Sequence, residues 1–453
     1  MKITKSEGVT PTENLLAKLC ENTFLKLWSY PNPIKDDKKE LCDLLAIFGN
    51  HVFIFYDREN LSLKKEGDTI TNWERWKKKA IDMQIKTAHG AEKYIRRNAK
   101  IFLDVELKSP FPIKIDTNNM IVHKIVIAHG AKDACREFSD ENVFGSLAII
   151  YGDKSDNIPF PFLITLDKNN PVHIFDSENL ELIFKELDTF YDFSRYLEAK
   201  ISAINNYEAL IYCGEEDLLA HYMLNYDESN HTHFIGYKDK KVNMIIIGEG
   251  EWKDFEQSDI FKRKKKSDEI SYVWDGLIQK TCQYALDGIT RGASIFNNKN
   301  AIYYMAMEPR FHRRELSDRI VRAINNFPQS QQPFVRLLTY IESFHKNRAY
   351  LFLQLKIDPI SDYDNEYRPY RQQLLEIACG VTKNKFKQLH SIIGIATEPP
   401  KLNEGTSEDF IYLDCSHWTK EDEEYYDSLN AQFGFLKSKD LKLNRKKGNE
   451  FPD

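Results

Sequence analysis

Apolar residues recur with two different periods in the first quarter of the chain. Over residues 12–28 and 72–97 they fall three or four positions apart, the spacing of one helix face. Between these segments, residues 41–48 and 51–56 are short aliphatic and aromatic runs separated by Gly49-Asn50, a pair suited to a two-residue hairpin turn. With a further run at residues 101–107, the pattern predicts helix, hairpin, helix and strand.

The rest of the chain alternates strand-like and helix-like patterns. After residue 112 such runs alternate up to about residue 258, and a Lys/Arg run at residues 262–266 is expected to be a solvated loop. The remainder begins with helical spacing, including residues 334–345, and passes into strands at residues 349–355 and beyond. We therefore predict an α/β protein with domains at residues 1–112, 113–258 and 259–453, the last two being a middle α/β domain and a mixed helical and α/β domain.

Composition narrows the class of protein. The 453 residues exceed the usual size of one hydrophobic core, and 42% of them are hydrophobic, which predicts a folded chain of several domains. No apolar run has the length of a membrane span and no apolar leader follows the first residues, so we expect a cytoplasmic protein without a membrane partner. The seven cysteines are single, without the spacing of a disulfide framework or zinc site. A Gly-rich nucleotide loop is incomplete, so no nucleotide cofactor is indicated.

Two aspartates interrupt the apolar pattern of the predicted hairpin. Asp43 lies within the first run, and Asp57, followed by Arg58, ends the second. A carboxylate in such a strand is destabilising if it is buried without a partner, so it needs a metal ion, a cation or an exposed strand end. Carboxylates on adjacent strands can bind magnesium, which activates a water molecule and stabilises charge on a phosphodiester.

This arrangement resembles the core of the PD-(D/E)xK nuclease superfamily, in which a helix bearing Glu precedes a hairpin that supplies Asp and Asp/Glu-x-Lys. The resemblance covers residues 1–112 and implies a restriction-endonuclease-like αββαβ core, with Mg²⁺ or Mn²⁺ as cofactor. It implies metal ligands at Asp43, Asp57 and Glu21, with Glu13 as the alternative to Glu21. The residues that it implies in catalysis are Asp43, Asp57, Arg58, Lys77 and Gln84.

Three of these residues have specific expected roles. Arg58 or Lys77 would supply the cation that the family's lysine provides. Gln84 lies in the apolar stripe of the second helix, where it either orients the site or is an amide that packs the helix against the sheet. The segment Asp104–Lys108 also contains a Glu-x-Lys, but it follows the second helix, where the family's motif does not belong.

Basic residues gather in two segments, although the formal net charge of the chain is −6. Cations along one face can neutralise phosphates and bind DNA or RNA without sequence preference, whereas a solvated charged face is the simpler interpretation of each segment. The residues predicted to bind nucleic acid are Lys78, Lys86, Arg96, Arg97, Arg310, Arg313 and Arg314.

The hairpin register favours a second hypothesis. With Gly49-Asn50 as the turn, Asp43 lies opposite Tyr56, and Asp57 points to the other face of the sheet unless a bulge intervenes. In strict register the family's acidic position is then Tyr56 and its lysine position is Arg58. The leading hypothesis is a metal-dependent nuclease with C-terminal recognition or regulatory domains. The alternative is a non-catalytic nuclease-fold scaffold that binds nucleic acid or a protein partner.

Overall fold

The computed structural model describes residues 5–58, 62–64, 66–139, 144–152, 160–237, 242–287, 295–399, 407–437 and 450–451. The chain is mixed α/β, and its internal contacts divide it into an N-terminal unit, Ile3–Phe261, and a C-terminal unit that begins at Lys262. Among the described helices, none combines the length and the apolar character needed to cross a membrane.

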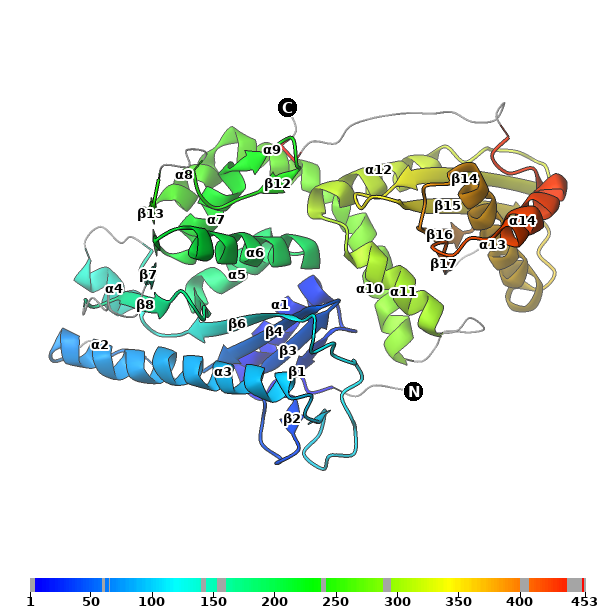
Figure 1. Cartoon of the computed structure of the whole chain (residues 1–453). Coiled ribbons are helices and arrows are strands. Elements are labelled where there is room, and N and C mark those ends of the chain that lie inside the picture. The colour runs from blue at the N-terminus through cyan, green and yellow to red at the C-terminus, as the bar shows by residue number, and fades with distance from the viewer. Residues whose placement is uncertain are drawn as a thin grey trace. The chain divides into compact units, whose positions relative to one another are not determined.

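The N-terminal unit is built on a five-stranded sheet (Figure 1). Its central hairpin pairs Phe48 with His51, which confirms the predicted turn at Gly49-Asn50. The outer strand on one side is antiparallel to the hairpin, and the last three strands are parallel to one another. The strands, in spatial order, are β1 (Ser29–Pro31), β3 (Leu44–Phe48), β4 (His51–Asp57), β6 (Ile121–Ala128) and β9 (His173–Asp176).

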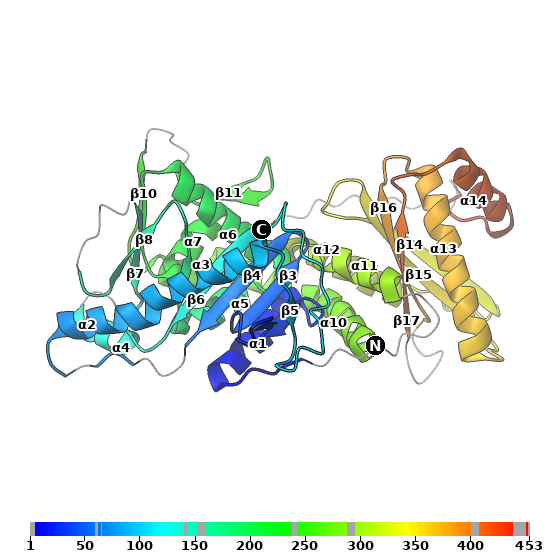
Figure 2. The ribbon, with the colours of Figure 1, turned by 60° about the horizontal axis from the view of Figure 1, so that its bottom comes forward.

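Helices cover both faces of this sheet. Helix α1 (Pro11–Phe24) begins at a capping box formed by Thr10 and Glu13, and its Phe24 ring lies 4.6 Å from the ring of Phe53 on β4. On the opposite face, α2 (Thr69–Lys77), a π-helical turn η1 (Lys78–Asp82) and α3 (Met83–Arg96) form one long rod (Figures 1 and 2). Lys124 of β6 pairs with Glu92 of α3 at 2.7 Å, which fixes α3 against the sheet.

The strand that follows this rod differs from the prediction. Only Ile101–Phe102 (β5) is extended in the predicted segment, and it pairs with β2 (Ile34–Lys35) away from the main sheet. Strand β6 instead lies beside β4, so the sheet continues across residue 112, where the sequence analysis placed a domain boundary. The Asp104–Lys108 segment lies in an exposed turn.

A second sheet completes the N-terminal unit, with its strands in the order β13, β10, β7 and β8. A buried ion pair between Lys200 and Glu215, at 2.6 Å, links two of the helices that pack against this sheet. The strands are β7 (Ala148–Gly152), β8 (Leu163–Asp167), β10 (Ala209–Cys213) and β13 (Met244–Ile247), with a small pair formed by β11 (Tyr226–Asp227) and β12 (Thr232–His233). The helices are α4 (Lys132–Phe138), α5 (Ser177–Glu186), α6 (Phe190–Asn206), α7 (Glu215–Leu224) and α8 (Glu251–Gln257).

The C-terminal unit combines a helical layer with a four-stranded sheet on which α13 packs (Figure 2). Its helical elements are α9 (Asp259–Asp268), whose first residues belong to the N-terminal unit, η3 (Glu269–Ser271), α10 (Tyr272–Asp287), α11 (Ile295–Ala306), α12 (Arg310–Asn325), η4 (Tyr363–Tyr367), α13 (Arg368–Lys385) and α14 (Lys420–Phe433). Its strands are β14 (Phe334–Glu342), β15 (Arg348–Ile357), β16 (Ser391–Thr397) and β17 (Glu408–Asp414).

Two predictions for this part of the chain are wrong. The segment at residues 334–345 is not a helix, because Phe334–Glu342 pairs antiparallel with β15 along its whole length. The Lys/Arg run at residues 262–266 is not a loop but lies in α9, where Lys264 is buried and bonds Asp268 at 2.8 Å. The prediction failed because a run of like charges does not reveal that one of its lysines, Lys264, faces inward and is buried in an ion pair.

Candidate active site

Acidic and imidazole side chains gather at one edge of the five-stranded sheet. Strands β4, β6 and β9 are parallel, so their carboxyl ends meet there and bring Asp57, His129 and Asp176 to the same edge. Strand β3 runs the other way and therefore begins at this edge, next to Asp43. In open α/β sheets this edge is where binding and catalytic groups collect.

Asp43 is the centre of a group of carboxylates. Its Oδ2 atom accepts a hydrogen bond from the backbone N–H of Asp57 at 2.5 Å. The side-chain amide of Asn32 links two further acids, since it donates to Glu13 at 3.2 Å and to Glu40 at 2.5 Å. Burial, followed by the negative charges of Glu40, Glu13 and Asp57, raises the pKa of Asp43 to about 7.

Asp57 is 4% exposed and its two carboxylate oxygens differ. Oδ1 forms a hydrogen bond with Nε2 of His129, the residue directly after β6. The backbone oxygen of His129 in turn accepts the indole N–H of Trp76, at 3.0 Å, so helix α2 is fixed to this edge. Oδ2 of Asp57 has no hydrogen-bond partner among the described residues, which leaves one buried oxygen with its lone pairs unused.

The carboxylates of Asp43 and Asp57 share the edge but have different partners. Phe53 and Phe55 pack against Phe24 of α1, and alternation along β4 places Asp57 on this same face. Asp43 directly precedes Leu44, the partner of Phe55, and its own backbone N–H donates to the oxygen of Phe55 at 3.1 Å, so the predicted pairing of Asp43 with Tyr56 is not formed. Asp43 therefore reaches the main chain of Asp57, while the carboxylate of Asp57 reaches His129.

The other predicted site residues are more scattered. The α1 carboxylate whose charge raises the pKa of Asp43 is Glu13, the alternative in the prediction. Glu21 lies two turns further along the helix. Arg58 is exposed directly after β4. Lys77 pairs with Asp82 at 3.5 Å on the α2–α3 rod. Gln84 is 1% exposed, and neither atom of its amide has a hydrogen-bond partner within the described parts of the chain.

The predicted nucleic-acid contacts divide into two groups. Lys78, Lys86, Arg96 and Arg97 are exposed on the α2–α3 rod. The three α12 arginines named in the prediction are buried, which corrects the prediction for them: Arg310 and Arg313 each pair with Asp275 at 2.7 Å, and Arg314 pairs with Asp268 at 3.1 Å. Because these guanidinium groups already neutralise buried acids, they are not available to phosphates.

A second acidic cluster lies where β10 meets α7. The helix begins at Glu215 with acids in its first turn, as the sequence predicts, but the acids are buried. Glu216 accepts from Ser146 at 2.5 Å, and Asp217 accepts the backbone N–H of Trp252 at 2.8 Å. Burial raises the pKa of Glu216 to about 7 and that of Asp217 to about 6. Each acid is bonded within the protein, so we assign the cluster a structural role.

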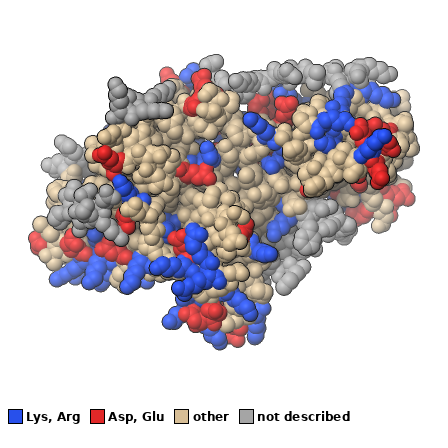
Figure 3. Space-filling model, in the orientation of Figure 1, with Lys and Arg blue, Asp and Glu red and all other residues tan. Residues whose placement is uncertain are grey.

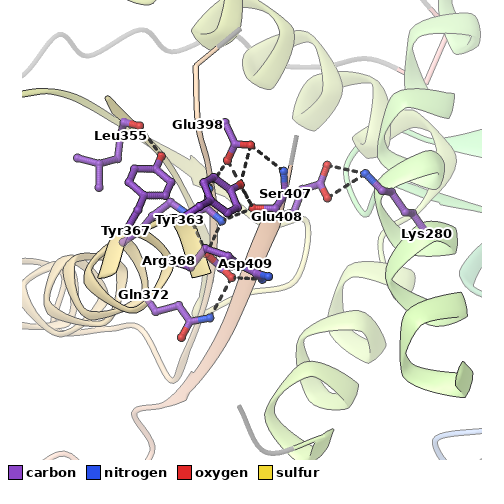
Figure 4. A network of polar contacts seen from close by, with 11 residues as sticks. Lys280, Leu355, Tyr363, Tyr367, Arg368, Gln372, Glu398, Ser407, Glu408 and Asp409 are labelled. Carbon is purple, nitrogen blue, oxygen red and sulfur yellow. Dashed lines mark hydrogen bonds and ion pairs between the residues drawn. The ribbon is translucent and has the colours of Figure 1, made fainter. Parts of the chain in front are cut away.

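The C-terminal unit contains a buried network centred on Arg371, whose partners Glu398 and Asp409 are labelled in Figure 4. Its guanidinium group, which is 0% exposed, lies 2.5 Å from both Glu398 and Asp409. The hydroxyl of Tyr363 donates to Glu398 at 2.8 Å, and the side chain of Arg368 donates to Asp409 at 2.8 Å. These carboxylates are fully engaged, so the network holds α13 to the end of β16 and the start of β17.

Sequence reasoning missed His129, Asp176 and Glu40 as members of the edge. His129 bonds Asp57 across 72 positions of the chain, and no local pattern reports such a contact. Within the described residues, no group of three or more His, Cys, Asp and Glu side chains is arranged to hold a metal ion. Comparisons with protein-family models, with curated proteins and with solved structures found no match to this chain.

Proposed function

We propose that the N-terminal unit is a PD-(D/E)xK-like nuclease domain that cleaves phosphodiester bonds of DNA or RNA with Mg²⁺ or Mn²⁺. The observation that carries this proposal is the hydrogen bond from the N–H of Asp57 to the carboxylate of Asp43. It joins two acids from neighbouring strands at the edge of the sheet, where the resemblance expects the reactive carboxylates.

The order of elements supports the proposal. The resemblance implies an αββαβ core, and α1, β3, β4, α3 and β6 follow one another in that order. The hairpin strands are antiparallel, and β6 returns parallel to β4 after the helical rod. The core then extends to residue 128, beyond the predicted limit of residue 112.

The residues at the edge fit a divalent cation. Magnesium is commonly bound through one or two carboxylates together with water and substrate phosphates, so Asp43 and Asp57 are sufficient protein ligands. The unpartnered Oδ2 of Asp57 offers one oxygen, and the carboxylates around Asp43 favour an added positive charge. Glu13 would complete the acidic set, and His129 would hold Asp57 in place. When bound, the metal supplies an activated water and stabilises charge on the phosphoryl group.

A non-catalytic nuclease-fold protein that binds nucleic acid or another protein is the second candidate. The observation that favours it is the orientation of Asp57, whose carboxylate bonds His129, while its backbone N–H bonds the carboxylate of Asp43. Arg58, at the position of the family's lysine, is exposed and cannot lose its proton to act as a base.

A cleavage assay distinguishes the two candidates. The purified protein is incubated with labelled single-stranded RNA, single-stranded DNA and supercoiled plasmid at pH 8 with Mn²⁺ or Mg²⁺, and with EDTA as the blank. Asp43→Asn and Asp57→Asn are compared with Asp104→Asn, a matched change in the exposed turn at residues 104–108. We expect metal-dependent cleavage that both edge variants reduce to the EDTA level and that Asp104→Asn leaves unchanged.

Two outcomes would overturn the nuclease proposal. One is the absence of cleavage of all three substrates by folded, unmodified protein. The other is cleavage by Asp43→Asn at the rate of the unmodified chain. Metal-independent binding of the same nucleic acids without cleavage would support the second candidate.

A further inference from the structure

A groove of about 790 Å³ lies between α3 and the end of β8. Its helical wall is one face of α3, on which Lys86, His89, Gly90 and Lys93 follow one another at intervals of three, one and three residues. Thr165 and Asn170 stand on the opposite wall. Both walls belong to the N-terminal unit.

The helical wall is basic and open. Lys86 and Lys93 are exposed and stand two helical turns apart, about 10 Å along the axis. Gly90 lies between them, and a Cβ atom added there would meet nothing within 4 Å, so no side chain blocks the groove at this point. Lys77 lies at one end and pairs with Asp82 at 3.5 Å, and Asp167 also lines the groove. Figure 3 shows Lys and Arg side chains gathered along the rod.

The inner part of the groove contains hydrogen-bonding groups. Asn170 bonds Nδ1 of His89 at 3.2 Å and accepts from Lys124 at 2.7 Å. Burial, followed by the charge of Lys124, lowers the pKa of His89, so its ring is neutral near pH 7. The hydroxyl of Thr165 is buried without a hydrogen-bond partner among the described residues. Neutral donors beneath a row of ammonium groups suit the oxygens of phosphates and sugars.

The groove is linked to the proposed site at its Lys77 end. The neighbouring residue, Trp76, donates its indole N–H to the backbone oxygen of His129, whose ring bonds Asp57. A polymer that follows the groove towards Lys77 therefore approaches the acidic edge. This continuity favours a phosphodiester chain over an acidic peptide, because only the former is a substrate of the proposed chemistry.

We propose that this groove binds the phosphodiester backbone of a single nucleic-acid strand, with Lys86 and Lys93 on its phosphates. The identity of the strand as substrate rests on the proposed function. Lysines in a row neutralise phosphates without reading bases, so binding depends on salt rather than on sequence. DNA and RNA share this backbone chemistry, and Thr165 and Asn170 lie on the wall where a 2′-hydroxyl could distinguish them.

The test is a binding titration in EDTA, where no metal-dependent cleavage occurs. Fluorescence anisotropy of labelled twelve-nucleotide oligo(dT) and oligo(U) is measured for the unmodified chain and for Lys86→Ala/Lys93→Ala. The matched control is Lys18→Ala/Lys114→Ala, which removes two exposed lysines elsewhere in the same unit. We expect the groove variant to weaken binding at least about 10-fold and to reduce the slope of log Kd against log salt by about 1.4, and the control to change neither.

Three results would overturn the proposed role of the groove. They are no binding by the unmodified chain, the same affinity and salt slope in the groove variant as in the unmodified chain, or the same loss of affinity in the control as in the groove variant. Binding of poly-glutamate in place of both oligonucleotides would assign the groove to an acidic peptide. The titration needs no catalysis, so the two proposals can fail separately. Binding through Lys86 and Lys93 without cleavage would contradict only the proposed nuclease activity. Cleavage without binding through these two lysines would contradict only the proposed role of the groove.

Discussion

Asp43 makes the stability of the N-terminal unit depend on pH. Its pKa is raised to about 7 from an ordinary value of 3.8, so the folded chain holds this proton more tightly than the unfolded chain does. Unfolding therefore becomes easier as pH rises from about 4 to about 7, and the full destabilisation is present above that range. The proposed metal ion would offset this cost, because it favours the charged form of the carboxylate.

Asp43→Asn should therefore stabilise the metal-free protein in alkaline solution. The amide oxygen can still accept the N–H of Asp57, but it carries no charge. We expect a gain of at least about 1 kcal/mol at pH 8, or ~2–4 °C in melting temperature, and almost no change at pH 4. Thermal unfolding in EDTA at the two pH values measures this difference.

Asp104→Asn should change the stability in the opposite direction. Hydrogen bonds from the backbone N–H groups of Lys108 and Ser109 lower the pKa of Asp104, so its charged form favours folding and this variant should be slightly less stable at pH 8. A less stable Asp43→Asn at pH 8 would show that its carboxylate is not under electrostatic strain.

The sequence identified half of the residues at the edge. Asp43 and Asp57 stand out because they interrupt apolar strands, and Gln84 stands out in an apolar stripe. Glu13 was named only as an alternative, because Glu13 and Glu21 both lie on the first helix. The hydrogen bond from Asn32 to Glu13, which places Glu13 at the edge, joins residues 19 positions apart. His129 is identified by the parallel pairing of β4 with β6, which depends on residues far apart in sequence.

At the scale of elements, one buried charge pair links α6 with α7. Lys200 and Glu215 are separated by 2.6 Å and almost fully buried, and the hydroxyls of Tyr196 and Tyr212 also donate to Glu215. Removing one member of such a pair leaves an uncompensated charge, whereas removing both charges is far less costly.

Lys200→Met should therefore lower the free energy of unfolding by about 3–5 kcal/mol. Lys200→Met/Glu215→Gln keeps an acceptor for the tyrosines and should recover at least about 1 kcal/mol of that loss. Chemical denaturation of the three proteins gives these values. If the double variant is less stable than Lys200→Met, the charge of Glu215 is not the source of the cost.

Local pattern predicted the first helix, the hairpin and the second helix, because each contains its own capping or turn signal. It failed at Phe334–Glu342, whose apolar spacing also fits a helix and whose hydrogen bonds come from β15. It also failed at Ile101–Phe102, where β-type residues pair with a short local strand while β6 takes the place beside β4. In both cases the partner strand decides the outcome.

At the scale of the molecule, the chain forms units with separate cores. Arg371 stabilises the C-terminal unit, because it bonds Glu398 and Asp409 within that unit. The domain pattern could not be predicted in full, because β6 and β9 lie beyond residue 112 and yet extend the first sheet.

Arg371→Met should destabilise the C-terminal unit by about 3–5 kcal/mol, because it leaves two buried carboxylates unpaired. Native-state hydrogen exchange should show faster exchange in β15 and β16 and unchanged protection in β4 and β6. An equal loss of protection in β4 and β6 would show that the two units unfold as one.

Metal binding by the edge of the five-stranded sheet is the most direct test of the proposed site, because it needs no knowledge of the substrate. Calorimetric titration with Mn²⁺ at pH 8 compares the unmodified chain with Asp43→Asn, Asp57→Asn and the control Asp104→Asn. We predict one ion per chain, bound more weakly at pH 6 because Asp43 must lose its proton, and lost in both edge variants but not in the control. Absence of Mn²⁺ binding by the unmodified chain, or equal binding by Asp43→Asn, would contradict the assignment of these carboxylates to a metal-dependent nuclease site.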